Sequence, residues 1–106
     1  MSGQVVIAIY RPKPDQVEEL KRLVGRHLPT LRNLGLVTDR EGVVLESGDG
    51  TIVEIFEWKS GAAAQEAHTA APVQELWDAM GDVADFATLA DLPEATRQFP
   101  HFNPVQ

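Results

Sequence analysis

The chain has 106 residues, 43% of them apolar, which is typical of a single globular domain with a thin core. Its net charge of −7 argues against nucleic acid and anionic membranes as partners, because both require a basic surface. The absence of cysteine excludes disulfides, a thiolate nucleophile, iron–sulfur clusters and cysteine-based zinc sites. Together with the lack of a signal-peptide pattern and of a membrane-length apolar run, it predicts a cytoplasmic protein.

The first third of the chain predicts a strand followed by a helix. The run QVVIAIY, residues 4–10, is rich in β-branched residues and typical of a buried strand. Apolar residues at helical spacing then predict a helix over 15–27. Pro29 is expected to break or kink this helix, because proline lacks a backbone N–H and its ring clashes with the preceding turn. A second turn over 29–34 should end at Gly35.

The rest of the chain predicts a hairpin, two helices, a last strand and a tail. Gly48-Asp49-Gly50 indicates a tight turn between two strands, and Ser60 suits the N-cap of a helix. The domain, residues 1–106, is expected to have a core over 4–90 and an extended arm over 91–106 with one turn near 93–97. The predicted elements are strands over 36–47, 51–59 and 83–89 and helices over 61–69 and 72–81.

This order, β-α-β-β-α-β, predicts an α+β fold of the ferredoxin-like type, with helices on one face of an antiparallel sheet. Side chains alternate between the two faces along a strand. The purely aliphatic face is expected to lie under the helices, and it carries Val5, Ile7, Ile9, Val53 and Ile55. The opposite face is too apolar for water and is expected to meet the sheet of a second subunit, with a pocket between the two sheets. That face carries Val6, Ala8, Tyr10, Ile52, Glu54, Phe56 and Trp58.

Glu54 is a candidate catalytic residue because it lies mid-strand between apolar neighbours. A carboxylate held there can act as a general base toward a ligand in a dry pocket. The alternative is a structural role, either at an exposed edge or in an ion pair with Arg11 or Arg40. Tyr10 and Trp58 are candidates for lining the pocket, although both also fit as ordinary core or interface aromatics.

His68 is the second candidate catalytic residue, near the end of the alanine-rich helix. A neutral imidazole there can move a proton or hold a polar ligand atom. The alternative is a histidine placed only to interact with the helix C-terminus. His27 and His101 are expected at the surface, and the three histidines are too scattered to predict a metal site. Zinc-protease, phosphate-loop and serine-hydrolase motifs do not occur in the sequence.

The segment from Thr51 to Met80 has the most specific pattern in the chain. A strand ends in Glu57-Trp58-Lys59-Ser60, then come Ala64, Glu66, Ala67 and His68, and then Val73 to Trp77. With the element order, residues 4–90 resemble the antibiotic-biosynthesis-monooxygenase type of dimeric α+β barrel. The resemblance implies a homodimer with facing sheets and an apolar cavity in each protomer.

The resemblance also implies an activity, a cofactor-independent monooxygenase acting on a small aromatic or quinol-type substrate. Members that oxidise such molecules need no metal or flavin, because the substrate anion itself activates oxygen. Haem degradation is not implied, because the first strand lacks an asparagine and His68 comes too early. In this interpretation Glu54 or His68 would assist deprotonation, and the ring would be held by Tyr10, Phe56, Trp58 and Trp77.

Two other functions fit the same fold. One is a non-catalytic dimer that binds a small apolar ligand or serves as a structural protein. The other is an isomerase- or decarboxylase-like enzyme that transfers protons in the same cavity and needs no oxygen.

Overall fold

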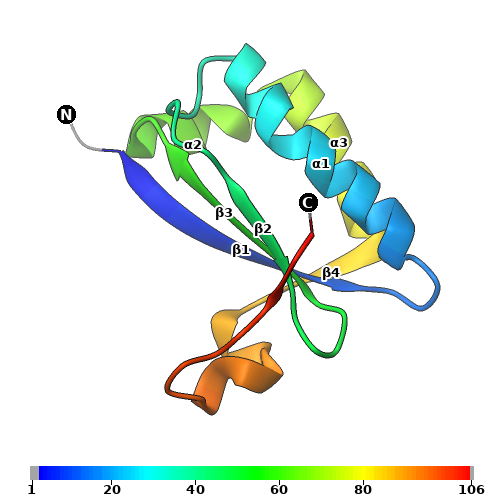
Figure 1. Ribbon diagram of the computed structural model, residues 1–106. Coiled ribbons are helices and arrows are strands. Elements are labelled where there is room, and N and C mark those ends of the chain that lie inside the picture. The colour runs from blue at the N-terminus through cyan, green and yellow to red at the C-terminus, as the bar shows by residue number, and fades with distance from the viewer. Residues whose placement is uncertain (1–2, 106) are drawn as a thin grey trace.

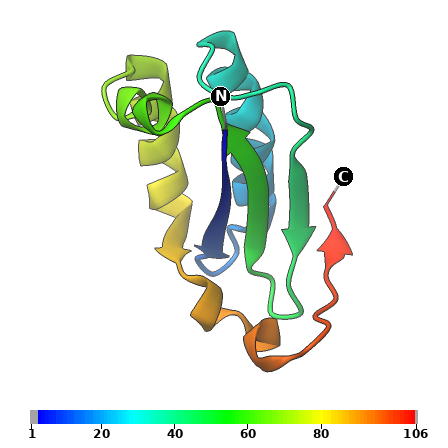
Figure 2. The ribbon, with the colours of Figure 1, turned by 90° about the vertical axis from the view of Figure 1, so that its left-hand side faces the viewer.

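The computed structural model describes residues 3–105, which form a five-stranded antiparallel sheet with helices packed on one face (Figure 1). The strand order is β4-β1-β3-β2-β5, and the predicted β-α-β-β-α-β succession of an α+β fold is confirmed. Figure 2 shows the sheet from its other face, with α1 behind it. The elements are β1 (Gln4–Pro12), α1 (Val17–Asn33), β2 (Val43–Glu46), β3 (Ile52–Trp58), α2 (Gly61–Ala67), α3 (Ala71–Val83), β4 (Ala84–Ala87), the 3-10 turns η1 (Leu89–Asp91) and η2 (Pro93–Thr96), and β5 (Asn103–Pro104).

α1 runs without interruption through Pro29, so the predicted break there is wrong. Pro29 and Gly25, the residue four positions before it, lie on an exposed flank of the helix, where water can bind the Gly25 carbonyl. The buried side chains lie both before and after the proline and hold the helix to the sheet. Each apolar side chain among them stabilises the fold by about 1.5–3 kcal/mol. Their sum exceeds the cost of a proline inside a helix, which is about 3 kcal/mol. These buried residues are Leu20, Leu23, Val24, His27 and Leu31.

The hairpin between β2 and β3 turns where the sequence predicts it. The Ser47 N–H donates to the Thr51 carbonyl at 2.8 Å, and Gly50 has a φ of 91°, which favours glycine. β2 starts only at Val43, later than the predicted residue 36. Before it, the chain makes only a single bridge, from Val37 to Trp58. The predicted N-cap of α2 is confirmed, because Ser60 Oγ accepts from the Ala63 N–H at 3.1 Å.

The two faces of the sheet are reversed relative to the prediction. Tyr10 and Ile52 pack beneath α1 and α3, against Leu20 and Met80. The aliphatic face points away from the helices, and Ile7 on it is 43% exposed. The prediction failed because it treated polar side chains as unfit for the helix-covered core. A buried polar group is tolerated when it is hydrogen-bonded, and here the polar groups of Tyr10, Glu54 and His27 bond to one another.

The C-terminal arm packs against one end of the sheet face that lacks helices and returns along the edge of β2 (Figures 1 and 2). Leu92 packs there against Ile9 and Val53, with Phe102 beside them. The end of the arm forms β5, a fifth strand next to β2 that the sequence analysis did not predict.

Glu94 ties the arm to the β2–β3 hairpin. Its carboxylate accepts from Ser47 Oγ at 2.8 Å and from the Gly48 N–H at 3.0 Å. The hydrogen bond from the Gly48 backbone is the largest cause that lowers the pKa of Glu94, and the bond from Ser47 adds to it. Glu94 therefore holds the arm in place as an ionised side chain.

Candidate active site

A pocket of about 290 Å³ lies on the helix-covered side of the sheet, next to β1. β4 pairs only with β1 residues from Ile9 to Pro12, so the first half of β1 has no strand on that side. Side chains from α1, α3 and the end of α2 close the space above this stretch. The pocket is lined by Val6, Ala8, Tyr10, His27, Phe56, Trp58, His68, Trp77 and Phe86.

The walls of the pocket are aromatic rings packed edge to face. Phe56 and Trp58, two residues apart on β3, have ring centroids 5.1 Å apart. Tyr10 of β1 lies opposite Phe86 of β4, with centroids 5.7 Å apart. Such pairs stabilise each other beyond the area that they bury, so the walls are formed before any ligand enters.

A chain of four hydrogen-bonded side chains runs from the pocket into the core. The Tyr10 hydroxyl donates to Glu54 Oε1 at 2.8 Å, and His27 Nδ1 lies 2.9 Å from the same oxygen. The Trp77 indole Nε1 donates to His27 Nε2 at 2.9 Å. β1, β3, α1 and α3 each contribute one of these residues, and Glu54 and His27 are only 2% exposed.

The Trp77 contact fixes the proton on His27. An indole N–H can only donate, so Nε2 is the unprotonated, accepting nitrogen. The remaining ring proton of the neutral imidazole must then be on Nδ1, which donates it to Glu54. Glu54 accepts two hydrogen bonds on one oxygen, an arrangement that suits a carboxylate. His27 and Glu54 thus form a dyad in which the carboxylate orients a neutral imidazole, as in other acid–base sites.

Tyr10 is a hydrogen-bond donor in this site and not a base. Burial is the largest cause that raises the pKa of its hydroxyl well above the usual value, and the charge and hydrogen bond of Glu54 raise it further. The phenol therefore stays protonated near neutral pH and keeps Glu54 in place.

The structure places Glu54 differently from the sequence prediction. It lies under α1 rather than between two subunits, and it reaches the pocket through Tyr10 and His27 instead of lining it. Among residues 3–105 it forms no ion pair with Arg11 or Arg40, the partners considered in the alternative interpretation. Arg40 pairs with Glu57 at 2.9 Å.

The other predicted site residues meet at the pocket. Tyr10, Phe56, Trp58 and Trp77 all line it, and the exposed His68 lies at its edge with its ring 5.1 Å from that of Trp77. The location between two sheets is wrong, because all of these residues lie on the helix side of one sheet.

His27 is the residue that the sequence analysis missed. It was predicted at the surface but is buried, whereas His101 is exposed as predicted. The signal was present in the sequence, because His27 lies three residues after Val24 and four before Leu31, on the buried stripe of α1. Ending the helix before Pro29 placed His27 at a helix end and hid this position.

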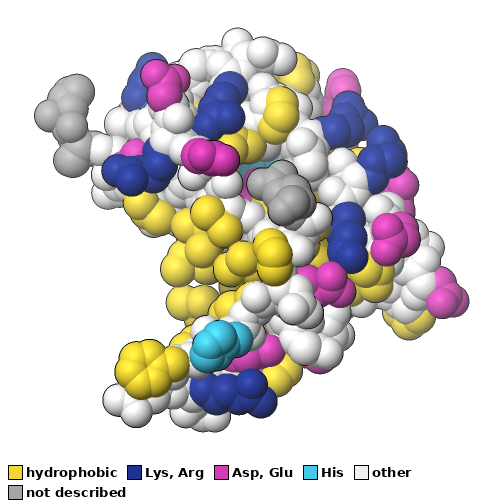
Figure 3. All heavy atoms as spheres, in the orientation of Figure 1, with side chains coloured by type: hydrophobic (Ala, Val, Ile, Leu, Met, Phe, Trp, Pro, Cys, Tyr) yellow, Lys and Arg dark blue, Asp and Glu magenta, His cyan; other side chains and the backbone are white. Residues whose placement is uncertain are grey.

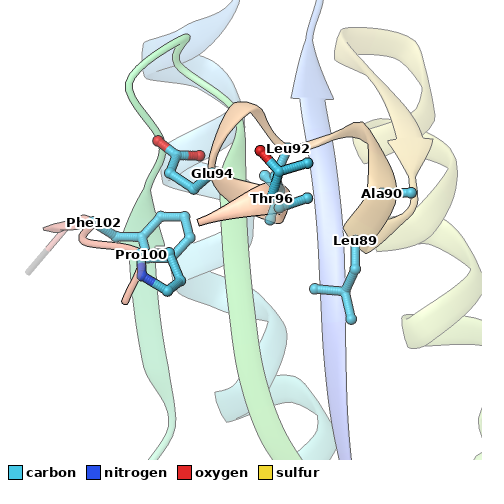
Figure 4. A pocket seen from close by; sticks show the side chains of 8 residues that line it. Leu89, Ala90, Leu92, Glu94, Thr96, Pro100 and Phe102 are labelled. Carbon is cyan, nitrogen blue, oxygen red and sulfur yellow. The ribbon is translucent and has the colours of Figure 1, made fainter. Parts of the chain in front are cut away.

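A larger hollow of about 600 Å³ lies at the other end of the molecule, within the arm (Figure 4). Leu89, Leu92, Pro100 and Phe102 line it, and its one ionisable lining side chain, Glu94, is engaged by the hairpin. The groups suited to acid–base chemistry are therefore in the pocket beside β1.

No cluster of three or more histidine, aspartate or glutamate side chains that could hold a metal ion occurs within residues 3–105. In the same part of the chain, no helix is both long and apolar enough to cross a membrane. Comparison of the chain with protein-family models, curated proteins and solved structures gave no match.

Proposed function

We propose that the chain is a cofactor-independent monooxygenase-like enzyme of the antibiotic-biosynthesis-monooxygenase type, acting on a small aromatic or quinol-type molecule in the pocket beside β1. The observation that carries the proposal is the buried His27–Glu54 dyad at the base of an aromatic pocket. A volume of about 290 Å³ suits a compact substrate, since ligand pockets start at about 300 Å³.

His27 would be the base. A substrate O–H or acidic C–H that displaces the Trp77 indole can give its proton to Nε2, and Glu54 then stabilises the imidazolium through the Nδ1–H. The substrate anion reacts with O₂ at a ring-stabilised CH₂ group. One oxygen atom becomes the new carbonyl oxygen, and the other leaves as water with the two hydrogens of that carbon, one of them returned by His27.

His68 would hold a polar atom of the substrate at the pocket edge. It is exposed, packs on Trp77 and is free to reorient, whereas His27 is fixed by two hydrogen bonds. Replacing His68 should therefore affect substrate affinity more than the rate of proton removal.

The experiment is oxygen uptake with a panel of anthrones and quinols, comparing the parent chain with His27→Gln and Glu54→Gln. Both variants are expected to lose at least about 100-fold in kcat, the usual scale of general base catalysis. His101→Gln, at an exposed histidine, is the matched control and should keep full activity. Full turnover by His27→Gln would rule out the dyad as the base, and turnover without oxygen would indicate an isomerase or decarboxylase instead.

A non-catalytic ligand-binding protein is the second candidate, and one observation favours it. The Trp77 indole N–H donates to His27 Nε2, the nitrogen that would accept a substrate proton, so the base is covered in this conformation. This candidate predicts that aromatic ligands bind and quench the fluorescence of Trp58 and Trp77, while no variant or parent chain consumes oxygen.

We propose that two copies pair through the sheet face that lacks helices, giving a dimeric α+β barrel. Val5, Ile7 and Val43 on this face are each more than two-fifths exposed. Figure 3 shows hydrophobic side chains gathered in the hollow between this face and the arm. Ile7→Glu should turn a dimer into a monomer in sedimentation experiments, whereas Thr69→Glu on the helix side should not; a monomeric parent chain would contradict the proposal.

A further inference from the structure

A second, smaller cavity of about 180 Å³ lies on the opposite flank of α1 and ends at the same glutamate. Glu54 and the cationic Arg32 line it together with Val24, Gly25, Leu28, Pro29, Gly42 and Val44. Glu54 also bonds to Tyr10 and His27, which line the substrate pocket. One buried carboxyl group therefore stands between two cavities on either side of α1.

The register of the sheet shows how this arises. On β3, Glu54 lies opposite Ala8 of β1 on one side and opposite Val44 of β2 on the other. Ala8 lines the substrate pocket and Val44 lines the second cavity. Val44 does not seal the carboxyl group off from the second cavity, which Glu54 itself lines, whereas on the Ala8 side Glu54 reaches the pocket only through Tyr10 and His27.

Gly25 lines the second cavity on the α1 side. A glycine inside a helix costs about 1 kcal/mol relative to alanine. Packing does not require it here, because a Cβ atom added at Gly25 would meet no atom within 4 Å. The glycine leaves open space beside the cavity that ends at Glu54.

The second cavity continues toward water and charged side chains. A neighbouring hollow of about 430 Å³ shares Gly25 and Val44 with it and is lined by Glu18, Lys21 and Arg22. The cavity itself has room for a few water molecules, since each takes up about 30 Å³ in the liquid.

We propose that this second cavity is a proton port, through which Glu54 exchanges protons with solvent while a substrate fills the pocket. The role of the port rests on the proposed function, in which His27 accepts a proton from the substrate. When His27 takes a substrate proton at Nε2, Glu54 first stabilises the imidazolium, whose Nδ1 proton then moves to Glu54 and from there to water in the port. When the product takes a proton back from Nε2, the same steps in reverse restore the proton on Nδ1.

The test measures solvent exchange of the His27 Nδ1–H by NMR in the free chain of residues 1–106, so it needs no substrate. Val44→Phe fills the port next to Glu54, and its matched control Val43→Phe adds the same bulk on the other face of the same strand. We expect exchange to slow at least ten-fold in Val44→Phe only. The Trp77 Nε1–H, on the pocket side, should exchange at the same rate in both.

A second pair keeps the test decisive if Val44→Phe does not fold. Gly25→Leu narrows the port, and Gly25→Ala gains the same helix propensity without the bulk. Unchanged exchange in Val44→Phe and Gly25→Leu would overturn the port, and so would equal slowing in their controls. If exchange of the His27 Nδ1–H slows in Val44→Phe and Gly25→Leu but the parent chain consumes no oxygen, the port is supported. Only the proposed oxygenase activity is then contradicted.

Discussion

Glu54 and Glu94 are both buried carboxylates, but they belong to regions with different donors. Glu94 joins the arm to the hairpin and accepts from a backbone N–H and a serine, groups that do not titrate near neutral pH. Glu54 lies under α1 and accepts from the Tyr10 hydroxyl and from the ring of His27, whose other nitrogen bonds to Trp77 at the pocket. Burial alone therefore does not distinguish the two carboxylates, whereas the donors around each of them do.

The largest expected effect is that of Glu54→Leu on stability. Leucine has a similar size but leaves the Tyr10 hydroxyl and the His27 Nδ1–H buried without an acceptor. Each orphaned donor costs about 1–3 kcal/mol, so the free energy of unfolding should fall by about 3 kcal/mol in urea titrations. Glu66→Leu, at an exposed position of α2, is the control and should change stability by less than about 0.5 kcal/mol. A Glu54→Leu chain as stable as its parent would mean that the network contributes nothing.

The effect of Glu94→Gln should appear as a change in pH dependence and be smaller, because its donors lie at a turn where water can replace it. The pKa of Glu94 is lowered in the folded state, chiefly by the Gly48 N–H. Its contribution to stability is therefore complete above the unfolded pKa of about 4.3 and is lost as pH falls through the folded value. Urea midpoints measured from pH 7 to pH 3 should decline less steeply in Glu94→Gln than in the parent, and equal slopes would contradict the assignment.

Tyr10 provides the next test, since it is the only tyrosine in the chain. Burial raises the pKa of its hydroxyl, so tyrosinate absorbance near 295 nm, a wavelength typical of the anion, should appear only well above pH 10, the ordinary tyrosine pKa. The folded pKa lies above the unfolded one, so the contribution of Tyr10 to stability is complete below about pH 10 and is lost as pH rises through the folded value. Ordinary titration in the folded chain would contradict the burial of this hydroxyl against Glu54.

The smallest expected effect concerns the buried hydroxyl oxygen of Thr51. Thr51 Oγ1 has no hydrogen-bond partner within the part of the chain that the structure describes. Thr51→Val removes this hydroxyl and keeps the shape, so stability should stay the same or rise by up to about 1 kcal/mol. A loss of more than that in thermal unfolding would indicate a partner such as a bound water.

The sequence predicted the fold well because its order of elements depends on local signals. Gly48 to Gly50 and Ser60 act within a few residues, and both behaved as expected. The continuity of α1 through Pro29 could not be predicted, because it depends on the tertiary packing of Leu20 and Leu31.

Five of the predicted candidates, Tyr10, Phe56, Trp58, His68 and Trp77, line one pocket, but His27 and the arrangement of the residues were not predicted. Periodicity shows which side chains share a face, yet it does not show which face the helices cover. That choice depended on whether Glu54 had donors, and one of them, His27, comes from a distant helix. The role of the arm was equally hidden, because the contact of Leu92 with Ile9 joins segments far apart in the chain.

The two-residue strand β5 has a consequence for how the molecule behaves at high concentration. An exposed sheet edge is a template for pairing with other chains, and β2 would offer such an edge if the arm were absent. β5 covers it and presents Pro104, which has no backbone N–H to give to a further strand. Asn103 and Pro104 thus cover part of the β2 edge, and removing the arm is expected to open that edge to pairing with other chains.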